Sequence, residues 1–227
     1  WDLPQALQDK GGWENRDTIA RFADYAELMY RTLGDRVKRW YTHNEPWVVA
    51  WAGHQQGRHA PGIASHASAV QVCHHLLLSH AKAVEAYRQT APVAGEIGIV
   101  LNLYPTVPAS DSAADHQAAS LADSHHSWFL DPIYRGSYPA DFLDHLAAHG
   151  IRPEMKPDDL PYIASQRMDF LGINYYFRKV CQSAAADPIL PFQDFKPAGA
   201  PYTEMNWEVW PDGLYDLLVR LKKDYGD

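Results

Sequence analysis

The sequence has few cysteines, no excess of basic residues and no long apolar run. Two cysteines, Cys73 and Cys181, are too few to build a disulfide scaffold in 227 residues, so we expect two free thiols. Lysine and arginine number 20 against 28 acidic residues, a formal charge of −8. A nucleic-acid partner would need a basic face and is not expected. No apolar stretch approaches the ~18 residues of a membrane-spanning helix, so no membrane association is expected either.

Aromatic residues are the unusual part of the composition. Hydrophobic residues at 46% and charged residues at 21% are ordinary for a globular chain, but there are 8 Trp and 13 Tyr, with 12 His besides. Tryptophan and tyrosine combine a large apolar face with a polar tip, which suits sites that bind polar ligands. The composition therefore favours a protein that binds a polar small molecule.

Short apolar runs alternate with long amphipathic segments along the chain. Helices are expected over residues 17–33, 67–87, 115–130, 140–149 and 213–225. Strands are expected over residues 37–42, 96–102 and 168–176. Strands separated by long helices imply βαβ units and a parallel sheet, as in a doubly wound fold or a (β/α)₈ barrel. No strand is followed by the G-x-G-x-x-G of a dinucleotide fold, which favours the barrel.

Polar and aromatic side chains follow three of the predicted strands. The segments are Thr42 to Trp47 (T-H-N-E-P-W), Leu101-Asn102 and Asn174 to Tyr176. In a barrel the functional groups sit where strands end, so these residues are expected at one common mouth. Sugar hydroxyls need hydrogen-bonding groups and the sugar C–H face needs an aromatic plane. The strand ends therefore indicate a sugar site.

Glu45 is the best candidate for chemistry at that mouth. Hydrolysis of a glycosidic bond needs a proton for the leaving oxygen and a second carboxylate to meet the positive charge on the sugar. Glu45 follows a strand and is flanked by Asn44 and by Pro46-Trp47. Burial beside an apolar ring favours the protonated form of a carboxyl group. Spacing alone leaves a second interpretation equally open, a loop glutamate that caps the following helix.

Eight segments resemble, in order, the consecutive signatures of family 1 glycoside hydrolases, the β-glucosidase family. They are Trp1–Leu7, Gly11–Trp13, Gly34–Lys38, Asn44–Pro46, Gly57–Gly62, Trp128–Pro132, Asp169–Tyr176 and Thr203–Glu208. No single tripeptide is specific, but eight motifs in order are. The resemblance covers the chain from Trp1 to Tyr225.

The resemblance implies a retaining β-glucosidase on a TIM barrel, acting without a cofactor or metal on a small β-glucoside or oligosaccharide. Glu45 matches the family's acid/base, and Tyr176 matches the tyrosine that hydrogen-bonds the nucleophile. Trp47 and Trp207 fall on the aglycone side, and His126 stands where many members have asparagine. The implied substrate-binding residues are Trp1, Asn44, Trp47, Asn174, Trp207 and His126.

The family's nucleophile, a glutamate in a T-E-N-G motif, has no counterpart here. The sequence contains no Glu-Asn-Gly, and Thr203-Glu204-Met205-Asn206 matches a different family segment. We therefore expect residues 1–227 to be a single incomplete barrel domain, an internal fragment that runs from about the end of strand three through helix six. Because the open sheet edges are unpaired and the nucleophile is missing, this chain alone is expected to be inactive.

Several alternatives remain open at this stage. The whole protein could be a non-catalytic sugar-binding homologue, a β-galactosidase, β-fucosidase or 6-phospho-β-glycosidase, or a transglycosidase. A metal site is not expected, because neighbouring histidines such as His74 and His75 point about 100° apart on a helix. Asp159 is expected to be a structural hydrogen-bond anchor.

Overall fold

A computed structural model describes residues 3–91 and 93–226. Contacts within the chain divide it into two compact units. The first contains Trp1–Leu101, Asp131–Ser137 and Gly150–Ile173, and the second contains Asn102–Leu130, Tyr138–His149 and Asn174–Asp227. The prediction of a single domain over residues 1–227 stays a prediction.

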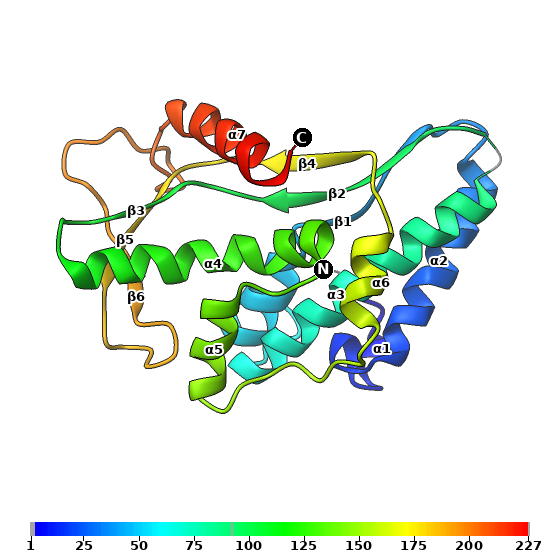
Figure 1. The fold of residues 1–227 in the computed structure, drawn as a ribbon, viewed down its shortest axis with the longest axis horizontal. Helices are drawn as coiled ribbons and strands as arrows, with labels where there is room; N and C mark the ends of the chain where they lie inside the picture. The colour runs from blue at the N-terminus through cyan, green and yellow to red at the C-terminus, as the bar shows by residue number, and fades with distance from the viewer. Residues whose placement is uncertain (1–2, 92, 227) are drawn as a thin grey trace. The chain divides into compact units, whose positions relative to one another are not determined.

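The first unit is built around a three-stranded sheet in the order β1-β2-β4. The strands are β1 (Arg39–Asn44), β2 (Glu96–Asn102) and β4 (Phe170–Asn174). Strands β1 and β2 are parallel, and the arrows of β2 and β4 point the same way in Figure 1. A Cβ atom on Gly98 of β2 would lie 2.2 Å from the carbonyl oxygen of Phe170, so this contact with β4 requires glycine.

The predicted strands agree with these elements to different degrees. The strand over 96–102 is confirmed at both ends. The strand predicted over 37–42 begins later, because the Val37 nitrogen donates to the Leu33 carbonyl at the end of the preceding helix. The strand predicted over 168–176 is shorter, because Tyr175 and Tyr176 follow the end of β4.

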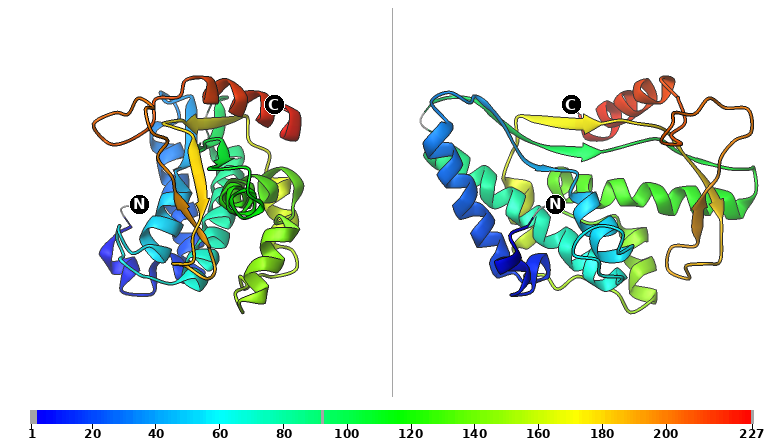
Figure 2. Two further views of the ribbon diagram at one scale, coloured as in Figure 1. Left: turned by 90° about the vertical axis from the view of Figure 1, so that its left-hand side faces the viewer. Right: turned by 180° about the vertical axis from the view of Figure 1, so that it is seen from behind.

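Two long helices cover this sheet. They are α2 (Asp17–Leu33) and α3 (His66–Thr90), which lie side by side in Figures 1 and 2. A core cluster joins them to β2 through Ala26 and Tyr30 of α2, Val84 and Tyr87 of α3, and Ile97. The remaining helical elements are α1 (Gln5–Gln8), the 3₁₀ turn η1 (Gly12–Glu14), the π-helix η2 (Val48–Gln55) and α6 (Asp159–Ser165).

The helix predicted over 17–33 is confirmed, and its Gly34 stop signal is the C-terminal cap residue. The helix predicted over 67–87 is longer by one residue at its start and three at its end. Ser65 caps that start by accepting a hydrogen bond from the Ser68 nitrogen at 3.2 Å, which satisfies one of the free N–H groups of the first turn.

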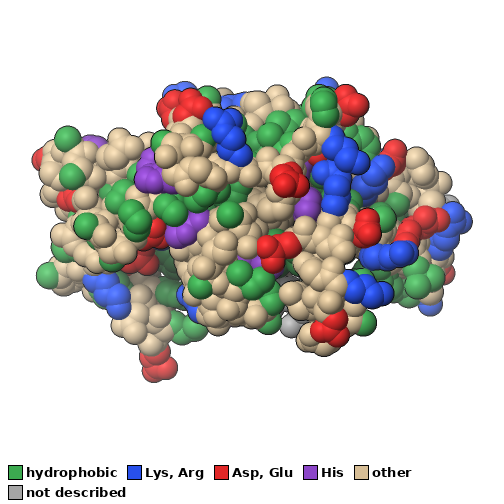
Figure 3. Space-filling view, turned by 90° about the horizontal axis from the view of Figure 1, so that it is seen from below, with side chains coloured by type: hydrophobic (Ala, Val, Ile, Leu, Met, Phe, Trp, Pro, Cys, Tyr) green, Lys and Arg blue, Asp and Glu red, His purple; other side chains and the backbone are tan. Residues whose placement is uncertain are grey.

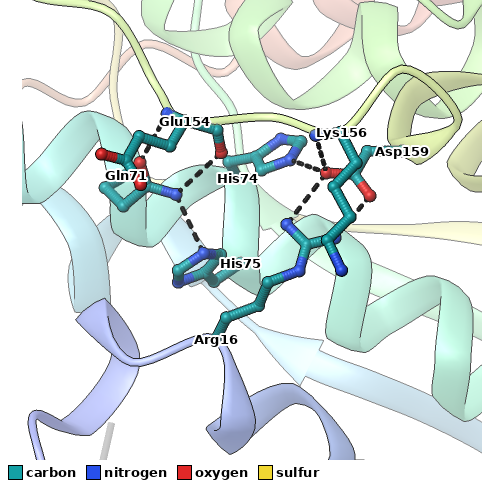
Figure 4. A network of polar contacts seen from close by, with 7 residues as sticks. All are labelled: Arg16, Gln71, His74, His75, Glu154, Lys156 and Asp159. Carbon is teal, nitrogen blue, oxygen red and sulfur yellow. Dashed lines mark hydrogen bonds and ion pairs between the residues drawn. The ribbon is translucent and has the colours of Figure 1, made fainter.

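Asp159 links three segments of the first unit, as the sequence predicts (Figure 4). Its carboxylate accepts two hydrogen bonds from Arg16, at 2.9 and 2.5 Å. It also lies 3.0 Å from His74 Nε2 and accepts the Lys156 backbone N–H at 2.8 Å. The hydrogen bonds from Arg16 and His74 hold the pKa of Asp159 well below its usual value, against the opposing effect of burial. The residue is therefore an anionic structural anchor.

The second unit contains a small mixed sheet in the order β3-β5-β6, for which the sequence gives no signal. Its strands are β3 (Thr106–Pro108), β5 (Lys179–Ser183) and β6 (Phe192–Asp194). Its helices include most of α4 (Ala113–Arg135), with α5 (Ala140–Ala148) and α7 (Asp212–Tyr225). Ala118 and Ala122 of α4 pack on Cys181 of β5. The helices predicted over 115–130, 140–149 and 213–225 match these elements to within a few residues, except that α4 continues through Pro132 to Arg135.

Acidic and basic side chains are interspersed over the face drawn in Figure 3. Both cysteines are free and buried. Within residues 3–91 and 93–226, no helix combines the length and apolar character that crossing a membrane requires.

Candidate active site

Strand β1 ends in a bulge just before the candidate acid. In the register with β2, Tyr41 pairs with Gly98 and Asn44 pairs with Val100. Two residues of β1, Thr42 and His43, therefore stand opposite one residue of β2. Bulges are uncommon in parallel pairs and are over-represented next to active sites, where they redirect a side chain.

Glu45 follows the bulge in an unusual backbone conformation. Its φ is 51°, one of two positive values found at non-glycine positions among the described residues. The Glu45 nitrogen donates to the Val100 carbonyl at 2.8 Å, and its carbonyl accepts from the Val48 nitrogen at 2.8 Å. The residue is 7% exposed. Left-handed geometry is unfavourable for a residue with a Cβ atom and persists where the surroundings enforce it, which is common in active sites.

Trp47 is half-buried and directly precedes the π-helix η2. Residues Val48 to His54 of this helix are all buried, and His54 Nδ1 donates to the Val49 carbonyl at 2.8 Å. π-helical turns are rare and are frequent at functional sites. The sequence does not predict this helix, because a run of small and apolar residues fits several helical geometries.

Asn44 borders a cavity of about 730 Å³ within the first unit. Aromatic side chains supply much of its wall, together with residues of α1 and α2. The wall includes Trp13, Phe22, Tyr25, His43 and Arg21. Asn44 is exposed and carries an amide that can both donate to and accept from a hydroxyl group.

The second unit contains four more of the predicted site residues, Asn174, Tyr176, Trp207 and His126. Asn174 is the last residue of β4, and Tyr176 is 46% exposed. The rings of Tyr176 and Trp207 are 4.9 Å apart between centroids. These two residues therefore present a phenol and an indole side by side, an arrangement suited to contact with a sugar or an aromatic group.

A tight turn holds Trp207 in place. Thr203 accepts the Asn206 backbone N–H at its carbonyl, 2.9 Å away, and the Trp207 N–H at its hydroxyl, 3.2 Å away. The next residue, Glu208, is buried and accepts hydrogen bonds from Nε and Nη2 of Arg178 at 2.8 and 2.9 Å. Glu204, which is not the counterpart of the family's nucleophile, is exposed in this turn.

His126 is 4% exposed within helix α4. Its ring lies edge-on to Tyr104, with centroids 4.4 Å apart, and its Nδ1 is 3.7 Å from an Asp123 carboxylate oxygen. Asp123 also pairs with Arg220 at 2.5 Å. Burial lowers the pKa of His126, so the imidazole is neutral near pH 7.

Asn102 completes the polar residues found at strand ends. It ends β2, and its Oδ1 is buried without a hydrogen-bond partner among the described residues. An unsatisfied buried oxygen at such a place is a candidate acceptor for a ligand hydroxyl. The strand-end pattern pointed to Asn102, although it was not among the residues that the family resemblance implied.

The predicted site residues thus fall into two groups. Asn44, Glu45 and Trp47 lie within four positions of the first unit, and Asn174, Tyr176, Trp207 and His126 belong to the second. Trp1 lies outside the described residues. Over the ranges 3–91 and 93–226, no group of three His, Cys, Asp or Glu side chains is arranged to hold a metal ion.

Comparison with known proteins gives consistent matches. The sequence profile of Glycosyl hydrolase family 1 matches residues 1–227. β-Glucosidase A of Acetivibrio thermocellus is 45% identical to this chain. The match covers 100% of this chain and 50% of the relative. The 6-phospho-β-glucosidase GmuD of Bacillus subtilis is 39% identical over 100% of the chain and 51% of the relative.

A solved structure agrees with the fold. The structure of β-glucosidase from Thermotoga maritima in complex with deoxynojirimycin superposes with a TM-score of 0.91 at 40% identity, covering 99% of this chain and 50% of that one. The α/β fold is therefore that of part of a family 1 TIM barrel, as predicted. The chain spans about half the length of the curated relatives it matches.

Proposed function

The chain belongs to glycosyl hydrolase family 1, and we propose that the whole protein is a retaining β-glucosidase in which Glu45 is the general acid/base. The observation that carries this proposal is the placement of Glu45. It is a buried carboxyl group held in a left-handed conformation at the end of a parallel strand, next to the amide of Asn44. A sugar-cleaving site needs a proton donor at that position of a barrel.

In the proposed reaction Glu45 acts twice. It first donates its proton to the glycosidic oxygen while a carboxylate nucleophile attacks the anomeric carbon, which forms a glycosyl-enzyme and releases the aglycone. It then takes a proton from the water that hydrolyses this intermediate. The nucleophile belongs to a part of the whole protein beyond these 227 residues, because the sequence contains no Glu-Asn-Gly.

The other predicted residues take supporting roles. Asn44 binds the sugar 2-hydroxyl, and Tyr176 hydrogen-bonds the nucleophile. Trp47 and Trp207 contact the aglycone, and Asn174 and Trp1 help to bind the substrate. The substrate-binding role of His126 stays a prediction; its side chain is buried and lies edge-on to the Tyr104 ring.

A 6-phospho-β-glucosidase is the second candidate, because one relative with that activity is 39% identical. Two relatives described as β-glucosidases are more similar, at 45% and 42% identity. The unphosphorylated substrate is therefore the first choice. Parallel assays with a β-glucoside and its 6-phosphate distinguish the two.

The test uses the whole protein with Glu45→Gln, and Glu204→Gln as the matched control. An alkyl β-glucoside has a poor leaving group that needs protonation, so its kcat/KM should fall by about 10²- to 10⁴-fold in Glu45→Gln. A dinitrophenyl β-glucoside needs little protonation, so its kcat/KM should change by no more than about threefold. Glu204→Gln should leave both substrates unaffected.

Equal losses on both substrates would overturn the assignment of Glu45. If the unmodified whole protein binds glucosides but hydrolyses none of them, a sugar-binding homologue is indicated instead. Transfer of glucose to a sugar in preference to water would indicate a transglycosidase. The 227-residue chain alone should show no turnover with either substrate, since it lacks the nucleophile.

A further inference from the structure

Two consecutive side chains of β1 are both bonded to helix α3. Thr42 Oγ1 lies 2.8 Å from His80 Nδ1, and His43 Nε2 lies 2.8 Å from Ser79 Oγ. In a regular strand successive side chains point to opposite faces, so neighbours cannot both reach one helix. The bulge removes this conflict, because Thr42 and His43 together stand opposite a single residue of β2.

The two partners on α3 are fully buried. Ser79 and His80 are both 0% exposed. The Ser79 hydroxyl donates to the Leu76 carbonyl at 2.8 Å, so it accepts the Nε2–H of His43. His80 Nε2 has no partner among the described residues, so its ring depends on Thr42 for hydrogen bonding. Removing either strand-to-helix bond would leave a buried polar group unsatisfied.

The His43 ring packs against two aromatic side chains, and the rings of both His43 and His80 are uncharged. The His43 ring stacks on Phe22 with centroids 4.4 Å apart and lies edge-on to Trp13 at 5.7 Å. Burial lowers the pKa of His43 to about 3 and that of His80 to about 4, so both rings are neutral at ordinary pH. The neutral His43 ring therefore holds the strand without adding a positive charge two residues from the candidate acid.

We propose that Thr42, His43, Ser79 and His80 form a positioning clamp that determines where Glu45 points. This inference depends on the proposed function for the catalytic role of Glu45, whereas the clamp itself is a feature of the backbone. The four are positioning residues, since they act through the strand rather than by touching the substrate.

The physical link runs through the register of the sheet. A shift of one residue exchanges the two faces of a strand for every residue that follows. The clamp holds Thr42 and His43 on the same side and thereby fixes which face Asn44 and Glu45 take. The Glu45 N–H bond to the Val100 carbonyl directly follows the register shift. Loss of the clamp would allow β1 to relax toward regular alternation and would move the Glu45 carboxyl away from its working position.

The test compares four variants of the whole protein. Thr42→Val keeps the shape of the side chain and removes its hydroxyl group, and Ser79→Ala removes the acceptor of His43. Thr42→Ser restores a hydroxyl and serves as the rescue variant. Thr90→Val is the matched control, because it removes a hydroxyl that donates to the Ala86 carbonyl at the C-terminal end of the same helix.

Two measurements distinguish positioning from general stability. For an alkyl β-glucoside, kcat/KM should fall by about tenfold or more in Thr42→Val and Ser79→Ala, because a displacement near 1 Å has effects of this size or larger. With the dinitrophenyl β-glucoside, kcat/KM of Thr42→Val and Ser79→Ala should stay within about threefold of the value for the unmodified protein. For Thr42→Ser and Thr90→Val, kcat/KM should stay within about threefold on the alkyl β-glucoside as well. Hydrogen exchange should quicken in the peptide over residues 42–48 in the first two variants only.

Equal losses on both substrates, or unchanged exchange over residues 42–48, would overturn the clamp. If the unmodified protein hydrolyses no glycoside, the proposed function fails separately. Hydrogen exchange then decides the clamp without any activity assay.

Discussion

Two non-glycine residues among those described have a positive φ, and they differ in burial and in the contacts that hold them. Glu45, with φ 51°, is 7% exposed at the end of a bulged strand, and the strand is bonded to a helix by buried side chains. Asn206, with φ 62°, is exposed in a local turn whose bonds come from Thr203. Asparagine tolerates this conformation, whereas glutamate has no local reason to adopt it.

The difference shows how strain indicates function. At Asn206 the sequence chooses a residue suited to the turn, so the conformation costs little. At Glu45 the conformation is enforced by contacts far away in the sequence, and the residue retained there is the one that the proposed chemistry needs. Position in the φ/ψ map alone would not separate the two sites, but burial and long-range bonding do.

The largest expected effect is a loss of stability in acid, to which the buried His80 beside β1 contributes. Burial lowers the pKa of His80 from 6.5 to about 4 in the folded state. As the pH falls below about 6.5, protons bind the unfolded chain first, so the free energy of unfolding decreases until about pH 4. For one such group the loss between pH 7 and pH 4.5 is about 2–3 kcal/mol.

Urea unfolding of the whole protein at the two pH values measures this loss. His80→Gln should reduce this loss by about 2–3 kcal/mol, the contribution of one such group. The exchange rate of the Glu45 N–H, corrected for intrinsic pH dependence, should rise in acid, and that of Asn206 should remain constant. An equal slope in His80→Gln and the unmodified protein would contradict this prediction.

How much of this contrast could be predicted from the sequence depends on the range of the interactions. The helix over 17–33 and the strand over 96–102 are determined by local apolar spacing and by Gly34, and both were predicted. The position of Glu45 after a strand was predicted in the same way. The bulge was not, because it depends on Ser79 and His80, which come more than thirty residues later.

The π-helix η2 and the sheet of β3, β5 and β6 were missed for related reasons. Strands of three residues such as Thr106–Pro108 and Phe192–Asp194 are too short to show an alternation of apolar and polar side chains. The orphaned oxygen of Asn102 is a property of packing, so the sequence could identify the residue but not its lack of a partner.

A second prediction concerns the backbone at both positions. Replacing Glu45 by glycine and by alanine removes the carboxyl in each case, so the pair differs mainly in tolerance of positive φ. The glycine variant should be more stable by about 1 kcal/mol, and the same pair at Asn206 should show a similar difference. Thermal unfolding of the four variants of the whole protein gives both values.

Activity separates the two sites in that experiment. Both variants at Glu45 should lose hydrolysis of the alkyl β-glucoside, and both variants at Asn206 should retain it. If alanine were as stable as glycine at Glu45, the left-handed conformation would not persist in the variant, and the backbone there would depend on the carboxyl rather than on the strand. That result would shift the cause of the strain from β1 to the side chain.

The smallest expected effect concerns the turn at Asn206. Thr203→Val removes the hydroxyl that accepts the Trp207 N–H at 3.2 Å. Thr203 is exposed, so water can replace the lost bond, and the free energy of unfolding should fall by only about 0.5 kcal/mol. The same Thr-to-Val change at Thr42, whose partner is buried, should cost at least about twice as much, since the His80 nitrogen is then left unsatisfied. Equal costs at the two positions would show that the bond from β1 to α3 is no more protected than a surface turn, and the contrast between the two positive-φ sites would lose its physical basis.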